Sequence, residues 1–254
     1  MPHQFILTPF TLGQATPGLA ALARPGWQLT EATPGGDSQV ERIADIHRGL
    51  FGLISETVKR GDRPVSLAGD CCAAIPVLAG LQSNALHPVV VWLDAHGDFN
   101  THATTITGFL GGMPLAMMSG RGDQTLMQAV RAHLLLDVDI ILADARDLDP
   151  LEEALLGGTS IQHLASLAEV VDAIPPHRPI YVHLDFDVLR PEDAPAMRYS
   201  VPGGPSLAEL VSLGSALRRT DRIAAISATA WEFGSDEDGA TARACMTALN
   251  SFLS

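Results

Sequence analysis

Three side chains of metal-binding type stand at alternate positions in the segment Asp94 to Asp98. The apolar run Val89 to Leu93 comes directly before them and is typical of a buried strand. Residues two apart point to the same side of an extended chain, so Asp94, His96 and Asp98 can converge where the strand ends. Because two carboxylates and one imidazole suit a divalent cation, this segment predicts half of a metal site.

A second acidic pair, Asp185 and Asp187, follows the apolar run Pro179 to Leu184, with one residue between the two carboxylates. An acidic residue at a strand end is, taken alone, commonly a helix cap or a turn former. Four carboxylates at the ends of two strands would repel one another strongly without a cation. Two such clusters therefore favour a shared metal centre.

The elements that must position these residues alternate between strands and helices. The expected strands are apolar runs of the kind buried on both faces of a sheet: Pro64 to Ala68, Val89 to Leu93, Val138 to Ala143, Pro179 to Leu184 and Ile223 to Trp231. Apolar residues recur at helical spacing in Ser38 to Val58, Ser206 to Leu217 and Gly239 to Leu253. The alternation predicts one α/β domain over residues 1–254 with a mainly parallel sheet, whose ligands bind beyond the carboxyl ends of the strands.

The composition excludes several classes of protein. The 254 residues are 46% hydrophobic and 18% charged, which fits a globular domain. The formal net charge of −13 argues against nucleic acid and anionic membranes as partners. Lys59 is the only lysine, and no glycine-rich Gly-Lys-Ser/Thr loop occurs, so a P-loop, a pyridoxal Schiff base and a kinase-type lysine lack support.

The length of the apolar runs and the number of cysteines indicate where in the cell the protein is expected. No apolar run reaches the roughly 18 residues that span a bilayer, and the first ten residues lack the pattern of a signal peptide. The 3 cysteines are an odd number, which suits a reducing compartment better than a disulfide framework. We expect a soluble, cytoplasmic protein.

The acidic motifs resemble the paired metal motifs of the ureohydrolase superfamily, which comprises arginases, agmatinases, formimidoylglutamases and related amidinohydrolases. Four further segments match that family in order and approximate spacing. The first is Leu67 to Cys71, at the family's Gly-Gly-Asp-His, and the second is Thr107 to Ala116, similar to the substrate loop that follows. The others are Arg146 to Pro150, similar to an arginase segment whose second Asp receives the substrate amino group, and Ala230 to Phe233, at a Glu that holds the guanidinium. The resemblance covers most of the chain and implies a three-layer arginase-like fold.

This resemblance implies a metal-dependent hydrolase of a linear amidine C–N bond, in a guanidino or formimino compound. Two divalent ions, usually Mn, would share a water and lower its pKa, giving a bridging hydroxide. The implied metal ligands are Cys71, Asp94, His96, Asp98, Asp185 and Asp187. The implied catalytic residues are Asp98 and Glu232, and the implied substrate-binding residues are Asn100, Asp149 and Glu232. The family is commonly trimeric or hexameric, so a homo-oligomer is expected.

The chain departs from the family pattern at three important positions. Cys71 replaces a metal-binding His, and a thiolate suits Zn, Fe or Co better than Mn. Alternatively, Cys71 is a small buried residue that binds no metal. Phe109 and Gly111 replace an Asn that helps to bind the substrate carboxylate and a His that shuttles protons. His102 is either a substitute shuttle or an exposed loop residue, and the substrate itself stays open.

Two other interpretations compete with a hydrolase. The segment His183 to Leu189 also resembles the nucleophile motif of haloacid-dehalogenase-like phosphatases, but that motif normally opens the chain, and no lysine follows it here. The second alternative is a catalytically degenerate arginase-fold protein that binds or regulates through an altered metal site. Metal analysis combined with a urea or ammonia release assay separates this alternative from an enzyme.

Overall fold

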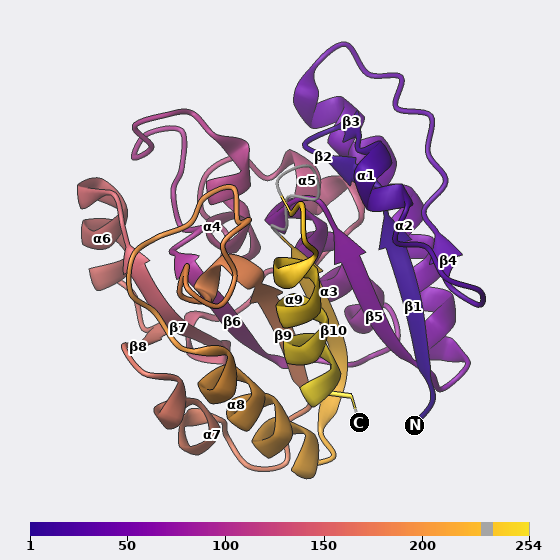
Figure 1. Cartoon of the computed structure of the whole chain (residues 1–254). Coiled ribbons are helices and arrows are strands. Elements are labelled where there is room, and N and C mark those ends of the chain that lie inside the picture. The colour runs from indigo at the N-terminus through magenta and orange to yellow at the C-terminus, as the bar shows by residue number, and fades with distance from the viewer. Residues whose placement is uncertain (230–235, 254) are drawn as a thin grey trace.

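The computed structural model describes residues 1–229 and 236–253, and its centre is an eight-stranded sheet (Figure 1). The strand order is β4-β1-β5-β10-β9-β6-β7-β8, and every neighbouring pair is parallel. The strands are β1 (His3–Thr8), β4 (Gln28–Leu29), β5 (Arg63–Ala68), β6 (Val89–His96), β7 (Ile140–Asp147), β8 (Gln162–Leu164), β9 (Ile180–Asp185) and β10 (Ile223–Thr229). A separate antiparallel pair joins β2 (Phe10–Thr11) to β3 (Gln14–Ala15).

Helices cover both faces of this sheet. One face packs mainly against α2 (Gln39–Lys59), α3 (Ala74–Gln82), α4 (Pro114–Met118), α5 (Thr125–Ala129) and α6 (Pro150–Gly157). The other packs against α1 (Pro17–Ala20), α7 (Val170–Ala173), α8 (Leu207–Arg219) and α9 (Ala240–Ser251). Short 3-10 turns are η1 (Cys71–Ala73), η2 (Leu110–Gly112), η3 (Asp137–Asp139), η4 (Leu167–Glu169) and η5 (Phe186–Val188). The result is the predicted three-layer arrangement with a parallel sheet.

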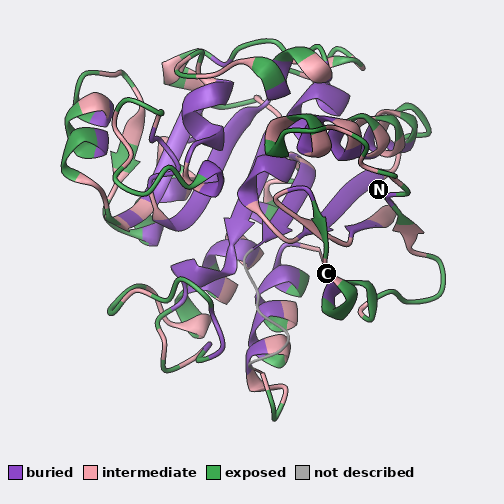
Figure 2. Cartoon of the chain, turned by 90° about the horizontal axis from the view of Figure 1, so that it is seen from above, coloured by how far each residue is buried: buried purple, intermediate pink, exposed green. Residues whose placement is uncertain are grey.

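Alternation along the central strands explains the two layers. On β6, Val90 and Trp92 pack toward α2 and α3, whereas Val89, Val91 and Leu93 pack toward α8 and α9. Figure 2 shows the strands buried and the exposed residues on outer helix faces and loops. Most positions of the central strands are therefore apolar, because both faces are covered, and the polar exceptions such as His183 and Ser227 are buried with them.

The predicted elements agree with the observed ones except at their ends. Ser38 and Ser206 each accept a hydrogen bond from the third helical residue's N–H and so start α2 and α8, close to the predicted positions. The strand expected from Val138 begins at Ile140, because a 3-10 turn occupies the preceding residues. The last predicted strand is seen as far as Thr229, and Trp231 lies outside the described residues.

The sheet order brings the carboxyl ends of β5, β10, β9 and β6 side by side. Parallel strands end at the same edge of a sheet, so the residues that follow them share one region of space. Among the helices that the structure describes, none has the length and apolarity needed to cross a membrane.

Candidate metal centre

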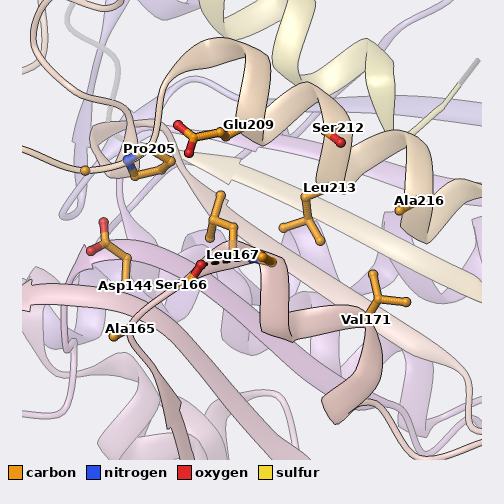
Figure 3. A pocket seen from close by; sticks show the side chains of 12 residues that line it. Asp144, Ala165, Ser166, Leu167, Val171, Pro205, Glu209, Ser212, Leu213 and Ala216 are labelled. Atoms are coloured by element: carbon orange, nitrogen blue, oxygen red, sulfur yellow. Dashed lines mark hydrogen bonds between the residues drawn. The ribbon is translucent and has the colours of Figure 1, made fainter.

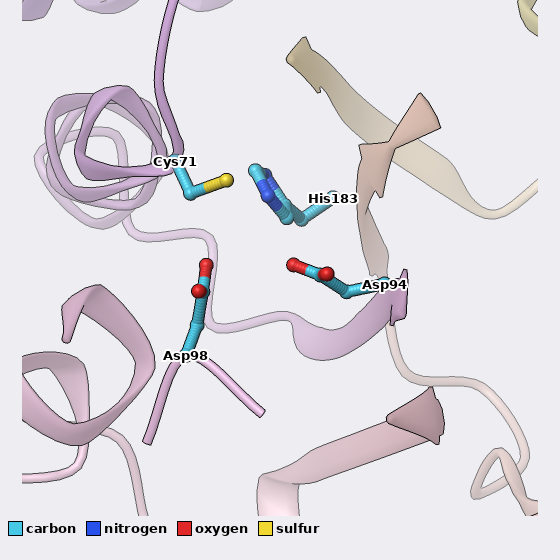
Figure 4. A group of neighbouring side chains, drawn as sticks. All are labelled: Cys71, Asp94, Asp98 and His183. Carbon is cyan, nitrogen blue, oxygen red and sulfur yellow. The ribbon is translucent and has the colours of Figure 1, made fainter. Parts of the chain in front are cut away.

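Four buried side chains meet at the carboxyl ends of the central strands (Figure 4). They are Cys71 from η1, Asp94 from β6, Asp98 from the loop after β6, and His183 from β9; we call them the Cys71 group. One potential ligand atom from each lies within 4.8 Å of those from the other three. Each residue is at most 7% exposed. The group thus offers one sulfur, one imidazole and two carboxylates in a dry environment.

A second group adjoins the first and shares Asp94 with it. His96 Nδ1 lies 3.4 Å from Asp94 Oδ1 and 3.2 Å from Asp187 Oδ2. We call Asp94, His96 and Asp187 the His96 group. Because Asp94 belongs to both groups, its carboxylate could bind a cation in each of two adjacent sites.

Asp185 connects the two groups through hydrogen bonds. Its Oδ2 accepts from Cys71 Sγ at 2.9 Å and from Thr229 Oγ1 at 3.2 Å, and its Oδ1 accepts from the Asp187 N–H at 2.9 Å. All six residues predicted as ligands therefore lie in one connected cluster. Their binding of a metal stays a prediction.

The backbone around Asp98 differs from the extended run that the sequence pattern predicts. β6 continues through His96, so Asp94 and His96 lie within the strand rather than after it. Asp98 then adopts a left-handed φ of 47°, and its carbonyl accepts from the N–H groups of Leu115 and Ala116 at the start of α4. This turn directs Asp98 to the Cys71 group. The sequence pattern predicts one point of convergence for Asp94, His96 and Asp98, whereas the structure distributes them over two adjoining groups.

Burial controls the protonation of this cluster. Burial, reinforced by repulsion from Asp187, raises the pKa of Asp185 to about 7. Burial and repulsion from Asp94 raise the pKa of Asp187 to about 6, and burial raises the pKa of Asp98 well above its usual range. Burial alone would lower the pKa of His96, but hydrogen bonds and charge from Asp187 and Asp94 raise it to about 12. Bringing charged ligands together here is costly unless a cation compensates.

The donor set fits a divalent metal ion. Asp98 Oδ2 and His183 Nε2 are buried and make no hydrogen bond within the described part of the chain. In residues 1–229 and 236–253, no lysine or arginine side chain forms an ion pair with Asp94, Asp98, Asp185 or Asp187. Buried polar atoms without partners are unusual, and ion binding would satisfy both of them.

The sequence analysis missed His183 as a site residue because it was counted among the apolar residues of a strand. The alternation of side chains along the strand could have identified it. Tyr181, His183 and Asp185 are two apart on β9 and face the same side, so a residue that shares a face with Asp185 points toward the same region. His183 is 0% exposed, and burial lowers its pKa to about 3, so its imidazole is neutral.

The two predicted substrate-binding residues that the structure describes, Asn100 and Asp149, lie next to each other. Asn100 and Asp149 come after the adjacent strands β6 and β7, and Asn100 Nδ2 donates to Asp149 Oδ2 at 3.1 Å. Glu152 ties both segments together, because its Oε1 accepts from the Phe99 N–H at 2.8 Å and its Oε2 from the Asp149 N–H at 3.2 Å. Glu232 lies outside the described residues.

The loop that carries Phe109 and Gly111 borders the Cys71 group. The Leu110 carbonyl accepts from Cys72 Sγ at 3.5 Å, and a Cβ placed on Gly112 would lie 4.0 Å from Asp98 Oδ1. Phe109 is partly exposed and packs against Tyr199, with ring centroids 5.2 Å apart. His102 is exposed in the same loop.

A pocket of about 490 Å³ lies elsewhere on the same protein, between α8 and the segment around η4 (Figure 3). Asp144, Ser166, Leu167 and Leu213 are among the residues that line it. None of the six predicted metal ligands does so. The pocket therefore does not alter the assignment of the candidate site.

Known proteins share both the sequence pattern and the fold. A family model described as the Arginase family matches residues 26–254. The chain belongs to the arginase family. The resemblance to the ureohydrolase superfamily is thus confirmed, and the phosphatase interpretation of His183 to Leu189 is wrong.

Similar sequences include enzymes with different names within this family. An Nω-hydroxy-L-arginine amidinohydrolase of Streptomyces lavendulae is 33% identical in an alignment 171 positions long, which covers 64% of this chain and 59% of that protein. An arginase of Brevibacillus brevis is 30% identical in an alignment 188 positions long, which covers 67% of this chain and 61% of that protein. The alignments thus span about three fifths of the length of these arginase-family relatives.

Solved structures establish the fold. An arginase from Bacillus caldovelox matches with a TM-score of 0.84 and 23% identity, over 99% of this chain and 97% of that one. A formimidoylglutamase from Bacillus subtilis matches with a TM-score of 0.75 and 17% identity, over 99% and 86%. The prediction of an arginase-like α/β fold is confirmed.

Proposed function

We propose that this protein hydrolyses a C–N bond of a linear guanidino or formimino compound and requires two divalent metal ions. The observation that carries this proposal is the pair of adjoining ligand groups that share Asp94, at the strand ends of an arginase-family fold. Membership of the family supports a hydrolase. The donor chemistry supports the metal requirement.

The chain's own residues divide between two ions. Cys71, Asp94 and Asp98 would hold the first ion, and Asp94, His96 and Asp187 the second, with Asp185 adjoining both. When bound, such a pair of ions lowers the pKa of a shared water so that it can attack a trigonal carbon at neutral pH. The ligands of the first ion include the sulfur of Cys71, which favours Zn, Fe or Co. The ligands of the second ion are only oxygen and nitrogen atoms, which suit Mn.

Asp98 has the geometry of a residue that binds and also handles a proton. Its buried Oδ2 has no hydrogen-bond partner in the described structure, and the pKa of its carboxyl is raised well above the usual range by burial, then by Asp94 and Asp185. One oxygen can bind the first ion while the other accepts a hydrogen bond from the attacking water. Asp98 is therefore proposed as a catalytic residue.

The substrate would be held at its two polar ends. Glu232 is proposed, from the family resemblance, to pair with the planar guanidinium, for which a carboxylate is a favourable bidentate partner. The hydrogen-bonded pair Asn100 and Asp149 is proposed to bind the amino end of the substrate. Phe109 and Gly111 give the loop a different surface from the Asn and His of arginases, so arginine itself is not the preferred member of the proposed class.

We further propose a homo-oligomer that acts in the cytoplasm. The described cysteines Cys71, Cys72 and Cys245 are all free and buried, which suits a reducing compartment. Size-exclusion chromatography with light scattering measures the oligomeric state directly.

The test is a hydrolysis assay on protein loaded separately with Mn, Zn, Co or Fe. Release of urea or ammonia is measured on a panel of guanidino and formimino compounds, with Asp98→Asn as the inactive control. We expect release with at least one compound in wild type and none in the control. Two bound ions without hydrolysis of any compound would favour the degenerate binding protein, to which the changes at Cys71, Phe109 and Gly111 also point.

A further inference from the structure

His183 lies on the central strand β9 between two side chains that hold its ring. The strand register places it opposite Trp92 on β6 and opposite Ser227 on β10. The indole of Trp92 stacks on the imidazole with ring centroids 3.7 Å apart, and Ser227 Oγ lies 2.8 Å from His183 Nδ1. Both contacts fix the plane of the ring, whose remaining nitrogen, Nε2, is buried and has no hydrogen-bond partner in the described structure.

A chain of hydrogen bonds determines which ring nitrogen carries the proton. The Tyr181 hydroxyl donates its proton to the Ala74 carbonyl at 3.2 Å, so its oxygen must accept from Ser227 Oγ–H at 2.7 Å. The single hydroxyl proton of Ser227 is then used, and Ser227 Oγ must accept from His183 Nδ1–H. His183 Nε2 is consequently left with a free lone pair.

We assign this lone pair to the Cys71 group, because His183 offers that group one ring nitrogen and its Nδ1 is already bonded to Ser227. The other members are a thiol and two carboxylates, and none of them can donate to Nε2 once ionised. A histidine whose other nitrogen is held by a hydroxyl is a typical metal ligand, because the second contact sets both tautomer and ring orientation. Trp92 also donates from Nε1 to Asp94 Oδ2 at 3.2 Å, so one indole orients two members of the group.

We propose that His183 Nε2 binds the first metal ion together with Cys71, Asp94 and Asp98, and that it supplies the imidazole that residue 71 lacks. This inference rests on the proposed metal-dependent function and adds a ligand to that site. One sulfur, one nitrogen and two oxygens form a four-ligand set that favours Zn or Co over Mn. The family pattern places this imidazole at the position of Cys71 in η1, whereas here it would come from β9.

A purely structural role predicts different behaviour. A buried imidazole that only fills space between Trp92 and Ser227 would affect stability and leave metal binding unchanged. His47 on α2 offers a matched control, because it is 2% exposed, burial lowers its pKa to about 3, and its Nδ1 has no partner in the described structure. It belongs to neither ligand group.

The first experiment titrates chelator-treated protein with Co²⁺ and records bound metal per chain together with the visible and near-ultraviolet spectrum. Wild type and His47→Ala should bind two ions, one of which has a thiolate-to-cobalt charge-transfer band. His183→Ala should lose more than about 100-fold in affinity for that ion, since even partners of a ligand are worth about 10–100-fold. Two ions of unchanged affinity and an unchanged spectrum in His183→Ala would overturn the proposal.

Two further measurements cover the case in which His183→Ala does not fold. Ser227→Ala keeps the imidazole but frees its Nδ1–H, and we expect a loss of about 10–100-fold in affinity for the first ion. X-ray absorption of the Zn-loaded wild type should give an average of one imidazole per ion, from His96 and His183. An average of one imidazole for every two ions would show that His183 is not a metal ligand.

A ligand exchange provides the sharpest test. The double variant Cys71→His with His183→Ser puts an imidazole at position 71 and removes the one on β9. It should bind two ions again and shift its preference toward Mn, whereas Cys71→His alone should keep measurable Zn preference. These measurements record metal binding and do not depend on turnover. If the protein hydrolysed none of the compounds above, the proposed reaction would be refuted, but the assignment of His183 as a metal ligand would not be affected.

Discussion

Cys71 and Asp185 are 114 positions apart in the sequence, yet Cys71 Sγ donates a hydrogen bond to Asp185 Oδ2 at 2.9 Å. Thr229, at the end of the strand between them, contacts both, at 3.2 Å from each. The contact joins the residue at which this chain departs from its family to an acidic residue that follows the family motif. A cation that takes the thiolate must displace this proton.

Replacing Cys71 therefore tests the metal stoichiometry. Cys71→Ser should weaken the first ion and leave the second largely bound, because serine is a poor substitute for a thiolate. Cys71→His should shift the preference only part of the way toward Mn, because His183 would still supply an imidazole, and less far than the double variant with His183→Ser. Bound metal per chain, measured after dialysis, decides the matter: equal stoichiometry and equal metal preference in wild type and Cys71→Ser would remove Cys71 from the site.

The same thiol predicts how metal uptake depends on pH. Burial, followed by the charges of Asp185, Asp98 and Asp94, raises the pKa of Cys71 well above its usual range. Binding must release this proton, so the apparent Zn affinity should still be rising above about pH 8.5, the ordinary pKa of a thiol. Isothermal titration at several pH values measures it. The Cys71→Ser variant should lose this high-pH part of the dependence, and a wild-type affinity already constant at pH 7.5 would contradict the prediction.

Asp185→Asn should stabilise the metal-free protein in a pH-dependent way. The pKa of Asp185 is raised from 3.8 to about 7 by burial and by Asp187, so the folded state holds a proton that the unfolded state releases. The penalty on wild type accordingly grows as pH rises from about 4 to about 7. The difference in Tm between Asp185→Asn and wild type, measured in chelator, should be larger at pH 8 than at pH 5. If the Tm difference between Asp185→Asn and wild type did not change with pH, the pKa of Asp185 in the folded protein would not be raised.

The acidic motifs and the apolar strands could be predicted because each has a local signature. Runs of apolar residues mark strands covered on both faces, and a carboxylate directly after such a run marks the sheet edge. Two features depend on tertiary contacts instead. The left-handed turn at Asp98 is held by α4 and by Glu152 through Phe99, and His183 acquires its orientation from Trp92 and Ser227 on neighbouring strands. No single stretch of sequence contains this information.

Asp149 provides a test of substrate binding. Asp149→Asn should raise KM by about 10–100-fold with a smaller change in kcat, since a hydrogen bond to a charged group contributes about 1.5–3 kcal/mol. Steady-state kinetics on the compound hydrolysed best measures both constants. Metal content should stay at the wild-type value, and a fall in kcat with unchanged KM would contradict a role in binding.

Glu152 should matter for stability as well as for the site. Glu152→Ala leaves the buried Phe99 N–H without its acceptor, which costs about 1–3 kcal/mol in the free energy of unfolding. Denaturant unfolding measures this loss. Glu152→Gln, which keeps an acceptor oxygen, should lose less, and equal losses in the two variants would show that the hydrogen bond is unimportant.

The ring of Phe109 occupies the space into which a side chain at position 111 would grow. A Cβ on Gly111 would lie 2.4 Å from Phe109 Cε1, so any larger residue requires the ring, which now packs on Tyr199, to shift. The two positions are consequently coupled. A side chain at position 111 and the ring of Phe109 compete for one space, so the effect of a substitution at either position depends on the residue at the other.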